Sequence, residues 1–121
     1  MQFIPNYFNH EDERGKITGL VNKGAWREFN LVRTNAGATR GGHYHKETRE
    51  IISILQGDVR VEIRKIVNGE DDCTLSFIVH EGDTFCIPQY TVHTLIAITP
   101  AVWINILEKP HNANSPDMWI A

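Results

Sequence analysis

Short segments in which apolar and polar residues alternate, each closed by a turn, restrict this chain to a β-sheet fold. In DVRVEIRKI (58–66) the apolar residues Val59, Val61 and Ile63 alternate with Arg60, Glu62 and Arg64, which is the pattern of a half-buried strand. The segments CTLSFIV (73–79) and VWINIL (102–107) also suit strands, and turn sequences such as QGD, which contains Gly57, separate the segments. No segment shows helical periodicity over three turns. We therefore expect an all-β protein with about nine or ten short strands, a barrel or a jelly roll.

The size and charge of the chain limit its organisation and its partners. With 121 residues and a mass of 13.8 kDa, the chain can bury one core but not two, so we expect residues 1–121 to form a single domain. The formal net charge of −3 and the pI near 6.0 give no basic surface for nucleic acid, which we do not expect as a partner. Because no run of about 18 apolar residues and no signal-peptide pattern occurs, we expect a cytoplasmic protein that does not enter a membrane.

Two histidines, one residue apart, precede a carboxylate in the segment GGHYHKETREI. Since residues two apart in a strand point to the same face, His43 and His45 project together and Tyr44 projects away. Glu50 follows after a short turn, and His93 opens a later strand-like segment. Three imidazoles and one carboxylate are ligands for a divalent transition metal such as Zn, Fe, Mn or Ni. Such a cluster would bury unpaired polar groups unless something binds them, so the sequence predicts a metal site.

The other three histidines, His10, His80 and His111, stand alone in the sequence. A single histidine in a strand or loop is more often a surface or hydrogen-bonded residue than a ligand. We expect no metal at these positions.

The spacing of the first cluster resembles the first motif of the cupin superfamily. All of its positions are matched, at Gly37, His43, His45, Glu50 and Gly57. This resemblance implies a single-domain cupin (RmlC-like) jelly-roll β-barrel with the metal at its centre, held by His43, His45, Glu50 and His93.

The second cupin motif is matched less completely. Gly82, Pro88 and His93 fit it, but Tyr90 stands where glycine is usual and Ala97 where asparagine is usual. The change at Tyr90 should alter the turn before His93, because tyrosine resists the positive φ that glycine supplies there.

Three further segments, DERGKITGL, TRGGHYHK and GDVRVEIRKI, are similar to the deoxysugar epimerase and ketoisomerase cupins. The tail NSPDMWI resembles the end of the cupin domain of capsular-polysaccharide reductase/epimerase proteins, and we expect it to pack on the body or on a second subunit. The resemblance implies an epimerase or isomerase that removes a proton next to the ketone of a nucleotide-linked 4-keto sugar.

The same resemblance assigns roles to individual residues. His43 matches the histidine base of the epimerases, and Arg40 matches the arginine that meets the nucleotide phosphates. His43 cannot act freely as a base while it coordinates a metal. The intact Glu50 favours the metal-bearing branch, in which another group such as Tyr90 would be the base. Tyr90 could equally be a residue that only packs on the turn, and Arg40 could form a surface ion pair.

Two other functions remain open, because fold alone does not determine function. A dioxygenase would use the same four ligands with Fe(II), and a non-catalytic cupin would bind a small ligand in the same barrel. In each case we expect a homodimer that pairs through edge strands and terminal segments.

Overall fold

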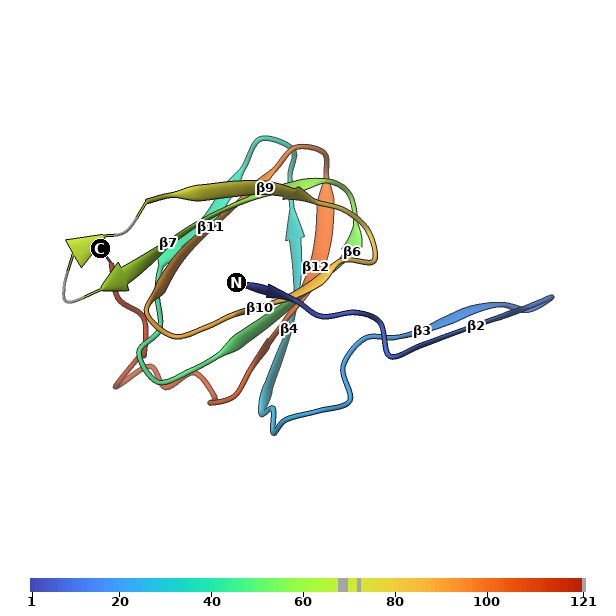
Figure 1. Cartoon of the computed structure of the whole chain (residues 1–121), viewed down its shortest axis with the longest axis horizontal. Coiled ribbons are helices and arrows are strands. Elements are labelled where there is room, and N and C mark those ends of the chain that lie inside the picture. The colour runs from blue at the N-terminus through green and yellow to red at the C-terminus, as the bar shows by residue number, and fades with distance from the viewer. Residues whose placement is uncertain (68–69, 72, 121) are drawn as a thin grey trace.

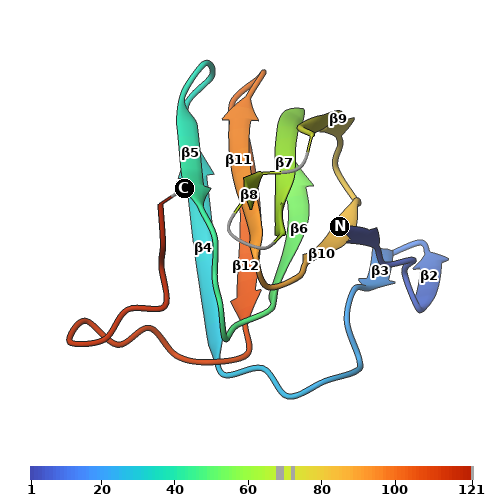
Figure 2. The ribbon, with the colours of Figure 1, turned by 60° about the vertical axis from the view of Figure 1, so that its left-hand side comes forward.

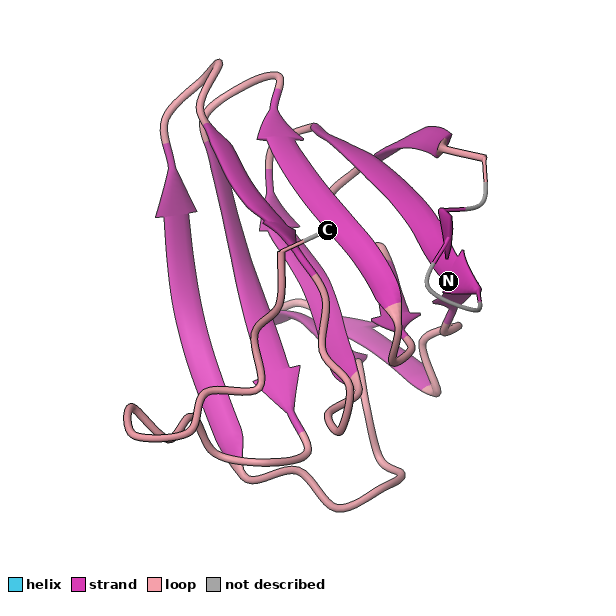
Figure 3. Cartoon of the chain, turned by 90° about the vertical axis from the view of Figure 1, so that its left-hand side faces the viewer, coloured by secondary structure: helices cyan, strands magenta, loops and turns pink. Residues whose placement is uncertain are grey.

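The structure, a computed structural model, describes residues 1–67, 70–71 and 73–120. Within these residues it contains twelve β-strands and no helix (Figure 3). There is accordingly no helix in the described chain that could cross a membrane. The strands are β1 (Gln2–Phe3), β2 (Phe8–Asp12), β3 (Gly15–Gly19), β4 (Glu28–Thr34), β5 (Thr39–His43), β6 (Glu50–Gln56), β7 (Val59–Val67), β8 (Glu70–Asp71), β9 (Leu75–Val79), β10 (Thr84–Ile87), β11 (Thr91–Ala97) and β12 (Ala101–Leu107). The expected all-β fold is confirmed.

Two antiparallel sheets form the walls of a barrel (Figure 1). The first has the order β1-β10-β6-β12-β4, and the second has the order β5-β11-β7-β8, with β9 also paired to β7. Neighbouring strands in each sheet are often distant in sequence, as expected for a jelly roll. The third sheet is the hairpin of β2 and β3, which projects from the barrel.

The core lies between the two sheets because the inward side chains of both are apolar. Ile54 of β6 and Phe85 of β10 come from the first sheet, and Val59 and Val61 of β7 and Val79 of β9 come from the second. All five are completely buried. The alternation expected in residues 58–66 is therefore present, with its apolar face turned into the barrel.

The polar residues of the first cupin motif gather at one end of this barrel. His43 ends β5 and lies opposite His93 of β11 in the strand register. Glu50 begins β6 and lies opposite Leu107, the last residue of β12. The ends of several strands therefore place these side chains together, next to the apolar core.

The C-terminal segment returns to this same end of the barrel. After β12 it runs outward and then back beside β5 (Figure 2). Trp119 and Tyr44 form an isolated antiparallel bridge with two backbone hydrogen bonds, of 2.9 and 3.0 Å. The tail thus packs on the body of its own chain, although Ile120 remains 88% exposed.

Candidate functional site

A cavity of about 360 Å³ opens at the end of the barrel where the motif residues meet. His43, His45, Glu50 and His93 all line it, and Arg40 contributes to its wall. Volumes of this size are usual for sites that bind small molecules. The structure therefore places these five sequence-predicted residues around one space.

The three histidines form a compact cluster in this cavity. Their ring centres are 4.7 Å apart for His43 and His93, 5.2 Å for His43 and His45, and 5.5 Å for His45 and His93. One nitrogen from each ring lies within 4.8 Å of those from the other two. A single ion could contact all three rings after small side-chain adjustments.

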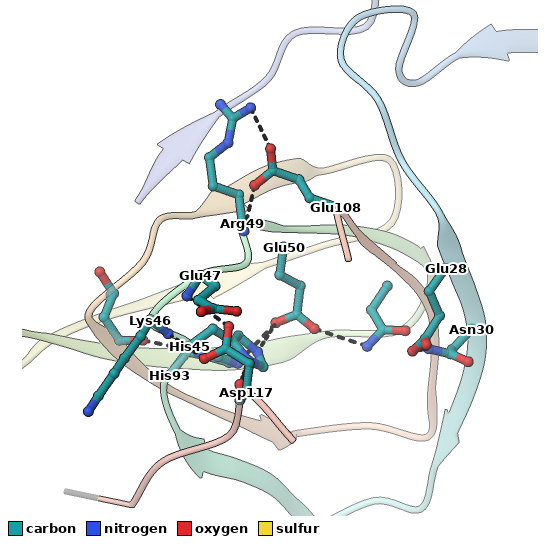
Figure 4. A network of polar contacts seen from close by, with 12 residues as sticks. Glu28, Asn30, His45, Lys46, Glu47, Arg49, Glu50, His93, Glu108 and Asp117 are labelled. Atoms are coloured by element: carbon teal, nitrogen blue, oxygen red, sulfur yellow. Dashed lines mark hydrogen bonds and ion pairs between the residues drawn. The ribbon is translucent and has the colours of Figure 1, made fainter. Parts of the chain in front are cut away.

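Glu50 lies beside two of these histidines (Figure 4). Its Oε2 atom is 3.0 Å from Nε2 of His93 and 3.8 Å from Nε2 of His45. Its Oε1 atom accepts a hydrogen bond of 2.9 Å from Nδ2 of Asn105. The carboxylate is thus buried and held in a fixed orientation by a neutral amide.

Backbone carbonyls determine which nitrogen of each buried ring carries a proton. Nδ1 of His45 is 2.6 Å from the carbonyl oxygen of Asp117, and Nδ1 of His93 is 3.1 Å from that of Thr91. A carbonyl can only accept, so both Nδ1 atoms are protonated donors, and whenever a ring is neutral its Nε2 turns a lone pair toward Glu50. This is the tautomer that a metal-binding histidine uses when its other nitrogen is hydrogen-bonded.

Two atoms at the centre of the cluster lack a hydrogen-bond partner. They are Nε2 of His45 and Oε2 of Glu50, and both are buried. In neutral histidines the Nε2 lone pairs would repel the carboxylate oxygen, which is also only an acceptor. A cation between them, either a proton or a metal ion, removes this repulsion. The residues present therefore fit a divalent transition metal.

The environment shifts the pKa values of the cluster in different directions. Burial, followed by the neighbouring His93 and His45, lowers the pKa of His43 to about 4. Burial also opposes protonation of His45, but the Glu50 carboxylate and the Asp117 carbonyl outweigh it and raise the pKa of that ring. Burial would raise the pKa of Glu50, yet the neighbouring His45 and His93 rings and the Asn105 amide hold it well below its usual range. His43 is therefore neutral at pH 7 in the metal-free site.

Arg40 is held against β4 by two hydrogen bonds. Its Nε donates to Oγ1 of Thr34 at 2.8 Å, and its Nη2 donates to the carbonyl oxygen of Arg33 at 2.9 Å. No carboxylate forms an ion pair with Arg40 in the part of the chain that the structure describes. The guanidinium is consequently fixed at the cavity wall with its charge uncompensated by a side chain.

Tyr90 lies in the turn before β11 and does not line the cavity. It adopts the left-handed conformation itself, with φ 56°, so the turn keeps the geometry that glycine usually supplies. Its amide donates to the carbonyl oxygen of His45 at 2.8 Å, while its ring centre lies 6.2 Å from that of Tyr44 and its side chain is 45% exposed. A catalytic role for Tyr90 stays a prediction.

The isolated histidines lie apart from the three-histidine cluster. His10 contacts Asp12, and His80 contacts Asp58, both at exposed positions. His111 is exposed at the rim of the cavity, where its amide donates to Glu28 at 2.7 Å.

Two residues that complete the site did not emerge from the sequence. Asn105 is the one polar residue of the apolar segment VWINIL, and that was a usable signal for an inward polar contact. Asp117 contacts His45 across 72 residues, and no local pattern indicates such a contact.

Comparison with known proteins identifies the family. Residues 10–119 match the sequence profile of the polysaccharide biosynthesis C-terminal domain. The chain is 32% identical over 60 residues to a UDP-2-acetamido-2,6-beta-L-arabino-hexul-4-ose reductase from Pseudomonas aeruginosa. The aligned region covers 50% of this chain and 16% of the reductase.

Solved structures share the fold. The capsular polysaccharide assembling protein CapF from Staphylococcus aureus has a TM-score of 0.71 and 22% identity over 93% of this chain and 32% of its own. A dTDP-4-dehydrorhamnose 3,5-epimerase from Bacillus anthracis has a TM-score of 0.77 and 17% identity over 92% of this chain and 73% of its own. The chain spans about a sixth of the reductase and about a third of CapF. With the barrel, its strand order and the profile match in agreement, this chain has the RmlC-like cupin fold and belongs to the polysaccharide biosynthesis C-terminal domain family.

Proposed function

We propose that this protein is an epimerase or isomerase that removes a proton from the carbon beside the carbonyl group of a nucleotide-linked keto sugar. The names of the similar proteins support the substrate class, since both a dTDP-4-dehydrorhamnose epimerase and a hexul-4-ose reductase are named for keto sugars linked to a nucleotide. The epimerase structure also carries bound TDP and pyrophosphate. The proposal transfers this chemistry to the cavity described above.

The observation that carries the proposal is a neutral imidazole and a fixed guanidinium on the same cavity. His43 is half-buried and its pKa of about 4 leaves it unprotonated at neutral pH, as a general base must be before it takes a proton. The same low pKa makes the free imidazole a weak base, so bound substrate must raise this pKa for proton transfer from carbon to be efficient. Arg40 is immobilised by Thr34 and by the backbone of Arg33, and a pre-oriented guanidinium suits the oxygens of a diphosphate. The sugar would thus occupy the cavity while its diphosphate meets Arg40.

The proposal includes a divalent transition metal, Zn, Fe, Mn or Ni, held by His43, His45, Glu50 and His93. Such a metal supplies a Lewis acid for the carbonyl oxygen on which negative charge develops. With His43 engaged as a ligand, the proton must go to another group, for which Tyr90 is the candidate from the sequence. The metal-free and metal-bound forms therefore assign His43 different roles, and an experiment can separate them.

Hydrogen exchange at carbon tests the proposal directly. The protein is incubated in D2O with a dTDP-linked 4-keto-6-deoxy sugar, once with metal and once after chelation, and deuterium at C3 and C5 is measured by NMR. Exchange in the chelated protein that is lost in His43→Gln identifies His43 as the base. Exchange that needs metal and is lost in Tyr90→Phe identifies Tyr90.

Arg40 is tested by binding rather than by exchange. We expect Arg40→Ala to weaken binding of the nucleotide sugar by about tenfold or more, the loss of one or more charge-assisted hydrogen bonds, and to leave binding of the free sugar unchanged. Equal effects on both ligands would remove Arg40 from the proposal.

The three histidines and Glu50 equally suit Fe(II), which keeps the dioxygenase as the second candidate. It predicts oxygen uptake by the Fe(II)-loaded protein with a small organic substrate. Absence of both carbon exchange and oxygen uptake would contradict both enzymes and favour a ligand-binding cupin.

A further inference from the structure

Asp117, in the C-terminal segment, makes an unusual set of contacts with the residues around His45. Its backbone carbonyl oxygen accepts from Nδ1 of His45 at 2.6 Å. Its carboxylate bridges two consecutive backbone amides, with Oδ1 accepting from Lys46 at 2.9 Å and Oδ2 accepting from Glu47 at 2.8 Å. Figure 4 shows Asp117 beside His45, Lys46 and Glu47.

We propose that Asp117 is a positioning residue that fixes the orientation and the tautomer of His45 in the candidate site. The part of this inference that concerns metal affinity rests on the proposed function. The part that concerns the His45 ring rests on the contacts alone.

The two kinds of contact act on different degrees of freedom of His45. The carboxylate holds the backbone directly after His45, because the amides of the next two residues both donate to it. The carbonyl holds the ring, because the Nδ1–H donor must point at it. Asp117 therefore restrains both the backbone that follows His45 and the rotation of the His45 imidazole. In this orientation Nε2 of His45 faces Glu50.

Trp119 supports this arrangement from the far side of Asp117. Its Nε1 donates to Oδ1 of Asp117 at 3.1 Å, and Nζ of Lys46 lies 3.7 Å from the centre of the Trp119 ring. The bridge between Trp119 and Tyr44 holds the same stretch of backbone. The carboxylate of Asp117 thus has a fixed position from which it orders the turn after His45.

A carboxylate of β4, Glu28, also holds the C-terminal segment, at a point that does not contact His45. Glu28 accepts from the amide of His111 at 2.7 Å and from Nδ2 of Asn30 at 2.8 Å. Neither of these groups touches His45 or the two residues after it. Glu28→Gln is consequently the comparison variant, since it loosens the segment and removes one negative charge from the cavity wall but leaves the contacts of Asp117 in place.

The experiment compares wild type, Asp117→Asn, Trp119→Phe and Glu28→Gln with two readouts. The first is the dissociation constant for Zn²⁺ and Co²⁺ measured by competition with a chromophoric chelator. The second is the NMR signal and exchange rate of the Nδ1 proton of His45 in metal-free protein. Thermal unfolding of each variant checks that it is folded.

Asp117→Asn keeps the backbone carbonyl that faces Nδ1 of His45, but it replaces one of the two carboxylate oxygens that hold the amides of Lys46 and Glu47 with an NH2 group, which cannot accept. Because the backbone after His45 is then held less firmly, we expect metal binding to weaken by about tenfold or more. Trp119→Phe removes one donor to Asp117 and should weaken binding by less. Glu28→Gln should also weaken binding by less than Asp117→Asn, because it removes a charge from the cavity wall but no contact of His45. The Nδ1 proton of His45 should exchange faster in Asp117→Asn alone.

Wild-type metal affinity and an unchanged His45 proton in folded Asp117→Asn would overturn the inference. An equal loss of affinity in Glu28→Gln would also overturn it, because the effect would then belong to the whole segment. If wild type itself binds no metal, the metal part of the proposed function fails, while the exchange rate of the His45 proton still decides the role of Asp117.

Discussion

His43 and His45 are two residues apart on one face of the chain, yet their pKa values are shifted in opposite directions. Burial dominates at His43 and favours its neutral form. Burial also lowers the pKa of His45, but Glu50 and Asp117, which lie at the two ring nitrogens, raise it by more. The difference follows from contacts outside the motif, so equal spacing in the sequence does not give equal chemistry.

The lowered pKa of His43 predicts a pH effect on the stability of the metal-free protein. Its folded value of about 4 lies below the unfolded value of 6.5, so the unfolded chain takes up the proton first as the pH falls. Stability should therefore decrease from about pH 7 to about pH 4, and His43 should contribute nothing to this change above about pH 7. His45, whose pKa is raised, acts in the opposite sense and stabilises the fold at low pH.

Denaturant unfolding of wild type and His43→Gln, with chelator, measures this effect. Wild type should lose more stability than the variant between about pH 7 and about pH 4. Parallel curves for the two proteins would mean that His43 titrates alike in the folded and the unfolded chain.

Gly57 must be glycine for two reasons, its positive φ and the absence of room for a Cβ atom. It connects β6 to β7 with φ 91°, and a Cβ atom there would overlap the carbonyl oxygen of Pro100. Gly82 has the same φ of 91°, but a Cβ there would meet nothing within 4 Å. Gly82→Ala should thus cost about 1 kcal/mol from conformational strain, and Gly57→Ala about 1 to 3 kcal/mol more from the overlap. Urea unfolding of both variants measures the difference, and equal losses would contradict the steric part.

At the level of elements, the pairing of β5 with β11 brings His43 opposite His93. The register of this pair shifts by one residue between His93 and Thr94. Thr94 lies opposite Gly41, and His93 lies opposite His43, so Gly42 falls between the two pairs. A Cβ on Gly41 would lie 2.5 Å from the carbonyl oxygen of His93, whereas one on Gly42 would meet nothing within 4 Å. The two consecutive glycines before His43 are therefore not equivalent.

This difference predicts that Gly41→Ala separates β5 from β11 and Gly42→Ala does not. Both residues have positive φ, so both variants carry the same kind of backbone strain of about 1 kcal/mol. Gly41→Ala should in addition weaken metal binding by about tenfold or more, since one ligand moves relative to the others. Equal metal affinities for the two variants would show that the approach of the two strands does not control the site.

The elements that could be predicted from the sequence are those in which local alternation carries the information. The inward face of β7 and the common face of His43 and His45 follow from a period of two, and Gly57 follows from its place between two strands. β1 and β8 have two residues each and are too short to show a period. Asp117 could not be found, because its contact depends on the path of the returning tail rather than on any neighbour in sequence.

The whole barrel separates its stabilising core from its candidate site. The apolar cluster includes Ile54, Val61 and Phe85 and none of the four proposed metal ligands. We therefore expect chelation to leave the barrel folded, with its β-sheet circular dichroism and a cooperative unfolding transition. The free energy of unfolding should fall only by the binding contribution, about 2.7 kcal/mol at a metal concentration of 100 times the dissociation constant, and the melting temperature should fall accordingly.

His45→Ala provides the matching variant for this prediction. It should lose metal binding and melt like the chelated wild type. Unfolding of either sample at room temperature would mean that the metal is part of the core.

Single-domain organisation and a cytoplasmic location stay predictions at this scale, and so does the homodimer.

The structure shows one place where a second copy could pair. β4 ends the first sheet, with β12 as its one neighbour among the described strands. Its outer face exposes Phe29 at 65% and Leu31 at 54%. An edge strand with large exposed apolar side chains is a common site of association.

If β4 forms the dimer interface, a charge on its outer face should dissociate the dimer. We expect wild type to sediment as a dimer and Leu31→Lys as a folded monomer, because an unpaired lysine would be buried between the two copies. Ile17→Lys is the control, since Ile17 is similarly exposed, at 59%, but lies on the projecting hairpin. A monomeric wild type would show the homodimer prediction to be wrong. Dissociation by Ile17→Lys alone would move the interface from β4 to the hairpin, where β2 and β3 extend away from the barrel.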